Sequence, residues 1–174
     1  MDSPLRVLFV CTANICRSAF AEVYASSDVS PASPGLQFRS AGTWGHPRHP
    51  IDPPMARQLE ARGISPASFR SHRVTADDVA WADVVLTMAK SHREFLLEDY
   101  PKALTKIFML GHVAERAVGG DLRGRDLLAD LARRRGGVHA AEDVRDPYGR
   151  GDEAAARAAA RIVDLVDTTI VALG

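Results

Sequence analysis

The sequence predicts an α/β fold in which a doubly wound, four-stranded parallel sheet carries helices on both faces. Short apolar segments alternate along the chain with segments whose apolar residues have helical spacing. The first apolar segment, LRVLFV, is nearly continuous, as expected of a strand buried on both faces. A length of 174 residues with 46% hydrophobic residues suits one compact domain. We therefore expect residues 1–174 to form a single domain.

The expected elements follow one another in the order of a parallel sheet. Apolar runs predict strands at 5–10, 82–88 and 106–110, and the turn residues Pro34-Gly35 and Gly42 bound a further strand predicted at 36–41. Helical spacing predicts helices at 19–25, 53–62, 91–99 and 152–172. Pro53 near the start and Gly63 after the end bound the second of these helices. Strands that alternate with helices favour a doubly wound sheet.

Residues 119–137 interrupt this alternation and are interpreted as an insert. The segment is bounded by glycines and holds one amphipathic helical piece that ends in three arginines, Arg133–Arg135. Cations are favourable at the C-terminal end of a helix, so we interpret the arginines as a solvated helix end rather than as a docking patch.

Composition excludes several classes of function. Twenty-two Lys and Arg balance 22 Asp and Glu, so net charge supplies no attraction toward nucleic acid or an acidic membrane. Two cysteines form neither a disulfide framework nor a structural zinc site, which fits a reducing compartment. The start of the chain does not resemble a signal peptide, and no apolar run approaches the roughly 20 residues of a membrane span. We expect a cytoplasmic protein without nucleic-acid partners or membrane insertion.

Cys11 directly follows the first strand, and Arg17 and Ser18 follow at the mouth of a helix, in the pattern C-x5-R-S. In such a turn, backbone N–H groups and the helix N-terminus form a cradle for an anion such as phosphate. The same dipoles and Arg17 favour the thiolate form of Cys11, which makes it a nucleophile. A buried cysteine at a strand end is the less favoured reading. The backbone of the cradle would come from Thr12, Ala13, Asn14, Ile15 and Cys16.

Displacement of an oxygen leaving group also needs a proton donor. Asp146 is the candidate, because Pro147 restricts it to extended geometry in the loop before the last helix. Asp143 is the alternative acid in the same loop. Arg17 would hold two phosphoryl oxygens with its planar guanidinium.

The segments VLFVCTANICRS, SAGTW and DPYG together resemble the low-molecular-weight protein-tyrosine phosphatases. The resemblance implies a phosphocysteine intermediate on Cys11, phosphate binding by Arg17, and proton transfer by Asp146. It also implies that four residues form a hydrogen-bond network around the loop, in which Ser18 donates to the Cys11 thiolate; these are Asn14, Ser18, Ser40 and His72. A surface position for His72 remains an equal alternative.

Tyr148 and Trp44 are the expected aromatic walls for a phosphotyrosine ring, with core packing as the alternative for Trp44. Many relatives carry Gly where Ala13 stands, so a left-handed backbone there would be mildly strained. Gly149 after Tyr148 is more similar to the bacterial branch that reverses tyrosine-kinase signalling in polysaccharide export. The implied partner is therefore a phosphotyrosine-containing protein, with a tyrosine kinase as one case.

Two alternative functions remain open. The resemblance extends to protein-arginine phosphatases, which carry Thr where this chain has Ile15; an apolar residue there favours a flat phenyl ring. Cys11 and Cys16 are also close enough in sequence for a redox-sensing, phosphate-binding module. No cofactor is expected. His46 and His49 lie in a Pro-rich loop without an acidic or Cys companion, so no metal site is expected there.

Overall fold

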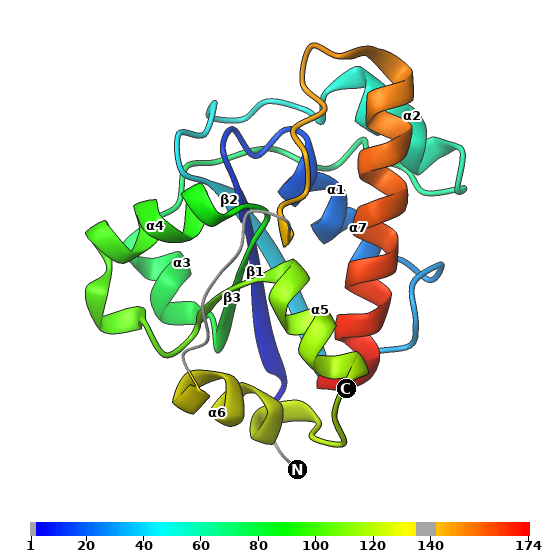
Figure 1. Cartoon of the computed structure of the whole chain (residues 1–174). Coiled ribbons are helices and arrows are strands. Elements are labelled where there is room, and N and C mark those ends of the chain that lie inside the picture. Colours follow the sequence, from blue (N-terminus) through cyan, green and yellow to red (C-terminus); the bar gives the residue numbers. More distant parts are fainter. Residues whose placement is uncertain (1–2, 135–141) are drawn as a thin grey trace.

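The computed structural model describes residues 3–134 and 142–174. Its centre is a parallel sheet of four strands in the order β2-β1-β3-β4. The strands are β1 (Leu5–Cys11), β2 (Leu36–Gly42), β3 (Val84–Thr87) and β4 (Ile107–Met109). Helices cover both faces of the sheet (Figure 1). The predicted fold class is therefore confirmed.

The helices divide between the two faces of the sheet. Helices α3 (Ala76–Trp81) and α4 (Lys90–Asp99) cover one face, and a short 3-10 turn, Pro101–Ala103, follows α4. The other face packs against five helices, of which the long C-terminal helix α7 (Gly151–Leu173) contacts the other four (Figure 1). The other four are α1 (Arg17–Ala25), α2 (Pro53–Glu60), α5 (Leu110–Val118) and α6 (Gly124–Arg134).

The central position of β1 in the sheet explains why its sequence is apolar at almost every position. Val7 and Phe9 belong to the core on the α1 and α7 face, whereas Leu8 and Val10 belong to the core on the α3 and α4 face. Each of the four side chains is at most 1% exposed. Both faces of the strand are buried, as expected in a covered parallel sheet.

Two helices, α3 and α5, have no counterpart among the predicted elements. Helix α3 spans only 6 residues, and it is stabilised by a capping box between Thr75 and Asp78. Helix α5 begins at Leu110, directly after β4, so the last residue of the predicted strand 106–110 is helical. The predicted strand 82–88 is shorter in the structure, and the helix predicted to reach residue 62 ends at Glu60, before Gly63 at φ +76°.

Helix α6 lies within the predicted insert 119–137, of which residues 135–137 are outside the described residues. Arg133 and Arg134 occupy its last turn and pair with Asp130 at 3.2 and 2.8 Å, as a solvated helix end would. Arg135 lies outside the described residues. In the described part of the chain, no helix is long and apolar enough to cross a membrane.

Candidate active site

The loop between β1 and α1 is held by hydrogen bonds to its carbonyl oxygens. Outside residues donate backbone N–H groups to Cys11, Thr12, Ile15 and Cys16 at 2.8 to 2.9 Å. In a trans peptide the following N–H points opposite to the carbonyl. The outward carbonyls therefore direct loop N–H groups toward the interior of the loop, where the N-terminus of α1 adds positive potential.

The loop lies directly against the end of β2. A Cβ atom on Gly42 would lie 2.5 Å from the carbonyl oxygen of Thr12 and 2.9 Å from the backbone N of Asn14. The left-handed residue of the loop is Asn14, at φ 57°, and not Ala13. Ala13 is therefore not in the left-handed region and carries no such strain. Asn14, which is, adopts this conformation more readily than most non-glycine residues.

A buried network of hydrogen bonds connects the loop to the core. Sγ of Cys11 lies 2.9 Å from Oγ of Ser18, and Asn14 Nδ2 donates to both Ser18 at 2.9 Å and Ser40 at 2.8 Å. Ser40 donates in turn to Glu22 at 2.5 Å. Burial raises the pKa of Glu22, against the opposing effect of the Ser40 hydrogen bond. The sequence reasoning missed Glu22, which looks like an ordinary polar residue of an amphipathic helix.

His72 joins this network through its backbone rather than its ring. Its N–H donates to Asn14 Oδ1 at 3.1 Å, while ring Nε2 lies 3.1 Å from Asp78 Oδ2. The hydrogen bond to Asp78 raises the pKa of His72. The His72 ring is half-exposed, as expected for a surface histidine, and only the backbone N–H of His72 takes part in the network around the loop.

Arg17 connects the loop to the segment before α7. Its guanidinium, only 6% exposed, donates to the carbonyl of Val144 at 3.0 Å and lies 3.3 Å from Asp146 Oδ2. Asp143, the alternative acid, instead accepts the backbone N–H of Lys90 at 2.8 Å at the start of α4. Of the two carboxylates, Asp146 is therefore the one that faces the loop.

A cavity of about 140 Å³ opens at this point. It is lined by Cys11, Thr12, Ala13, Ile15, Cys16, Arg17, His46, Asp146 and Tyr148. The loop, the arginine and the late aspartate, which are far apart in sequence, are thus brought together. His46 is an unexpected member; it lies 5.5 Å from His49 between ring centroids but contributes here as a wall.

Trp44 does not line this cavity. Its ring packs toward Phe95, with centroids 6.2 Å apart, and Arg73 lies over its face at 5.5 Å. The side chain is 67% exposed, so it does not cap the core either. The Phe95 contact places the indole beside α4, whereas Tyr148 lines the cavity.

His92 is a further residue that sequence reasoning missed. It is buried on α4, and its Nε2 lies 2.9 Å from Thr12 Oγ1. Burial, followed by the charge of Arg17, lowers the pKa of His92 to about 4. The ring is therefore neutral at neutral pH. Nothing in the local sequence signals this contact, because it joins residues 80 positions apart.

The two cysteines of the loop differ in their partners. Both are free and buried. Burial strongly raises the pKa of Cys16, and the nearby charges of Asp52 and Cys11 act in the same direction. Cys16 is therefore a thiol at neutral pH, whereas Cys11 is the cysteine with a Ser18 partner.

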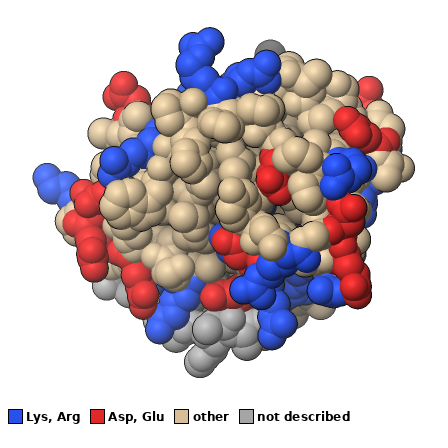
Figure 2. Space-filling model, turned by 90° about the horizontal axis from the view of Figure 1, so that it is seen from above, with Lys and Arg blue, Asp and Glu red and all other residues tan. Residues whose placement is uncertain are grey.

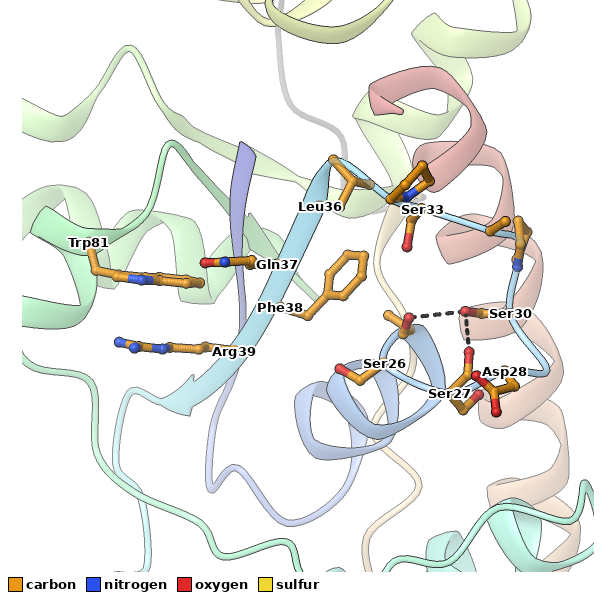
Figure 3. Close-up of a pocket in the computed structure, with 14 residues that line it drawn as sticks. Ser26, Ser27, Asp28, Ser30, Ser33, Leu36, Gln37, Phe38, Arg39 and Trp81 are labelled. Atoms are coloured by element: carbon orange, nitrogen blue, oxygen red, sulfur yellow. Dashed lines mark hydrogen bonds between the residues drawn. The ribbon is translucent and has the colours of Figure 1, made fainter. Parts of the chain in front are cut away.

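A second cavity, of about 890 Å³, lies elsewhere, along the open edge of β2 (Figure 3). Its walls include the segment after α1, the ring of Phe38, and Trp81 with Arg39 stacked 4.2 Å from the ring centroid. Ser30 closes the segment by donating to the carbonyls of Ala25 and Ser27. The residues that line this cavity include no cysteine and no residue of the loop between β1 and α1.

Seen from above, the molecule carries Lys and Arg in several separate places, interspersed with Asp and Glu (Figure 2). The loop after β1 lies at this end of the molecule (Figure 1). A mixed pattern of this kind does not form the continuous basic surface that phosphate backbones require.

Comparison with known proteins agrees with the geometry. Residues 6–126 match the family model described as low molecular weight phosphotyrosine protein phosphatase. The chain is by class a phosphoric monoester hydrolase. It belongs to the low-molecular-weight phosphotyrosine protein phosphatase family. Asp146 and Tyr148 lie beyond the matched residues.

The relatives include enzymes named for two different substrates. A protein-arginine-phosphatase of Geobacillus stearothermophilus is 33% identical over 107 residues, 62% of this chain and 70% of that protein. The Etp low molecular weight protein-tyrosine-phosphatase of Escherichia coli is 29% identical over 110 residues, 63% of this chain and 72% of that protein. A solved low molecular weight protein tyrosine phosphatase from T. tengcongensis aligns with a TM-score of 0.77 at 28% identity, covering 96% of this chain and 98% of that one.

Proposed function

We propose that the protein hydrolyses phosphotyrosine in proteins through a phosphocysteine intermediate. The observation that carries this proposal is the lining of the cavity above Cys11, to which the loop contributes Ile15 and the segment before α7 contributes Tyr148, and in which Asp146 is the single carboxylate among the described lining residues. Apolar and aromatic walls suit a phenyl ring. A cationic guanidinium would instead require carboxylate partners, and Asp146 already faces Arg17 at 3.3 Å.

In the first step, Cys11 Sγ attacks phosphorus while the bond to the tyrosyl oxygen breaks. Ser18 donates a hydrogen bond to the thiolate, and loop N–H groups with Arg17 hold the phosphoryl oxygens. Asp146 gives its proton to the leaving oxygen. In the second step, Asp146 takes a proton from water, which attacks phosphorus and releases Cys11 and phosphate.

The partner in this proposal is a phosphotyrosine-containing protein, and a tyrosine kinase is one such substrate. Relatives such as the probable EpsP phosphatase of Ralstonia solanacearum are named as tyrosine phosphatases. We also propose a cytoplasmic location, since two free cysteines suit a reducing compartment. That residues 1–174 are one domain with an insert at 119–137 stays part of the proposal.

The test compares hydrolysis of a phosphotyrosine peptide and a phosphoarginine peptide. We expect preference for phosphotyrosine, no turnover by Cys11→Ser, and a loss in kcat of about 10²- to 10⁴-fold in Asp146→Asn. Asp143→Asn is the matched control and should lose much less, because Asp143 faces α4. Binding of phosphate without turnover of either peptide would contradict the proposal and favour the redox-sensing module.

Protein-arginine phosphatase activity is the second candidate, favoured by the 33% identity to the Geobacillus enzyme. Ile15 distinguishes the two candidates. It lines the cavity at the position where the resemblance to protein-arginine phosphatases implies Thr. We expect Ile15→Thr to raise the rate on phosphoarginine relative to phosphotyrosine, with Ile15→Val as the control of nearly equal shape. A parent that already prefers phosphoarginine would reverse the assignment.

A further inference from the structure

A group of metal-ligating side chains lies apart from the Cys11 cavity. His112 and Glu115 are one turn apart on α5, and Glu142 approaches them from the segment before the Asp146 loop. One ligand atom from each residue lies within 4.8 Å of the others, and His112 Nδ1 is 3.5 Å from Glu142 Oε1. The group therefore combines one imidazole with two carboxylates.

The fold holds Glu142 against α5. A Cβ atom on Gly111 would lie 2.5 Å from the carbonyl oxygen of Glu142, so this approach requires glycine at the position next to His112. The following residues are also fixed, since Val144 donates its N–H to the carbonyl of Met88 at 2.8 Å. The placement of Glu142 beside His112 thus follows from backbone packing and not from their mutual attraction alone.

Two polar atoms of this group are buried without a partner among the described residues: His112 Nδ1 and Glu142 Oε2. The Glu142 side chain is 13% exposed and that of His112 is 21% exposed. Buried polar atoms are nearly always satisfied. A separation of 3.5 Å is long for a charge-assisted hydrogen bond, which normally spans about 2.7 to 2.9 Å. A cation between the two side chains would satisfy both atoms at once.

The ligand set indicates which cation. Imidazole is a good ligand for zinc and a poor one for magnesium or calcium, and zinc accepts three protein ligands with water in the fourth position. Glu115 is exposed and can rotate to close the ligand spacing. A cavity of about 540 Å³ between α5 and α7, lined in part by Glu115 and Glu142, leaves room for water; Arg161 and Asp164 also line it.

We propose that His112, Glu115 and Glu142 form a binding site for a transition-metal dication, with zinc preferred. Bound metal would fix the chain four residues before Asp146 onto α5. The site is distinct from the proposed catalytic centre, so metal binding and phosphatase activity can be tested separately.

The test is isothermal titration calorimetry of the full chain with ZnCl₂, in the Cys11→Ser protein so that the loop thiolate does not bind the metal. We expect one zinc per chain and at least a tenfold weaker affinity in Glu115→Gln, His112→Gln and Glu142→Gln. Glu153→Gln, on the exposed start of α7, is the control and should bind like the parent. Titration with MgCl₂ should give no binding.

A thermal melt supplies the second readout. Zinc should raise the melting temperature of the parent but not that of Glu115→Gln, an exposed substitution that leaves the partly buried His112 and Glu142 pair intact. Absence of zinc binding in the parent would overturn the proposal. So would binding that survives both Glu115→Gln and Glu142→Gln, because the metal would then lie elsewhere.

Discussion

Ser18 contacts only one of the two cysteines in the loop between β1 and α1. Its hydroxyl is 2.9 Å from Cys11 Sγ and is itself held by Asn14, whereas burial keeps Cys16 a thiol. Hydrogen bonds to charged groups contribute about 1.5 to 3 kcal/mol. A Ser18 hydroxyl that donates to Cys11 Sγ would stabilise the thiolate that the proposed reaction requires.

We expect Ser18→Ala to slow both phosphatase turnover and alkylation of Cys11 by iodoacetate, each by about 10- to 100-fold, which is the kinetic equivalent of that hydrogen bond. Mass spectrometry of the alkylated peptide checks the second effect. Ser30→Ala, at a buried serine away from the loop, should behave like the parent. Equal alkylation rates in Ser18→Ala and the parent would mean that Ser18 only fills space.

The sequence predicted the site residues that lie on the loop, and those whose residue type and neighbours match the chemistry of phosphate transfer. Cys11, Arg17, Asp146 and Tyr148 all line one cavity. His92 and Glu22 could not be found in this way, because their role depends on packing between α4, α1 and the sheet, which places side chains from distant segments behind the loop. Trp44 is not among the residues that line the Cys11 cavity, because its ring packs toward Phe95 and Arg73, and its role as a wall for the substrate ring stays a prediction.

Among the elements, β1, β3 and β4 were predictable because burial on both faces leaves a continuous apolar run, whereas the edge strand β2 was predictable from the Pro-Gly and Gly residues that bound it. Helices α3 and α5 were not. Six residues of α3 are too few for a periodic pattern, and the capping box of Thr75 defines that helix instead. Helix α5 begins at the residue after β4, so one apolar segment serves both elements and its boundary is set by tertiary packing.

The end of β2 supports the phosphate loop, and Gly42 permits that contact. We expect Gly42→Ala to reduce kcat/KM by at least tenfold, because the added methyl would lie 2.5 Å from the Thr12 carbonyl and must displace the loop. Gly35→Ala, at the turn residue directly before the same strand, has no atom within 4 Å of its Cβ position and is the matched control. Inhibition by inorganic phosphate should weaken in Gly42→Ala only; unchanged inhibition would contradict this role.

At the scale of the whole molecule, two histidines give stability opposite dependences on pH. The hydrogen bond to Asp78 raises the pKa of His72, so its contribution is present below about pH 6.5 and is lost as pH rises through the higher folded-state value. This pair is half-exposed on the His72 side and so contributes little. Burial lowers the pKa of His92 instead, and that contribution has the reverse sign.

His92 should therefore limit the stability of the protein in acid. The folded state binds its proton only near pH 4, whereas the unfolded chain binds it near pH 6.5, so stability present above about pH 6.5 is lost as pH falls toward 4. The difference corresponds to at most about 3 kcal/mol. Arg17 opposes the protonated ring and Asp146 favours it, so the effect belongs to this cluster and not to the histidine alone.

Urea denaturation at pH 7.5 and pH 5 should show a smaller loss in the free energy of unfolding for His92→Leu than for the parent, while His49→Gln, at an exposed histidine, should follow the parent. Parallel losses in His92→Leu and the parent would mean that carboxylates alone cause the acid sensitivity.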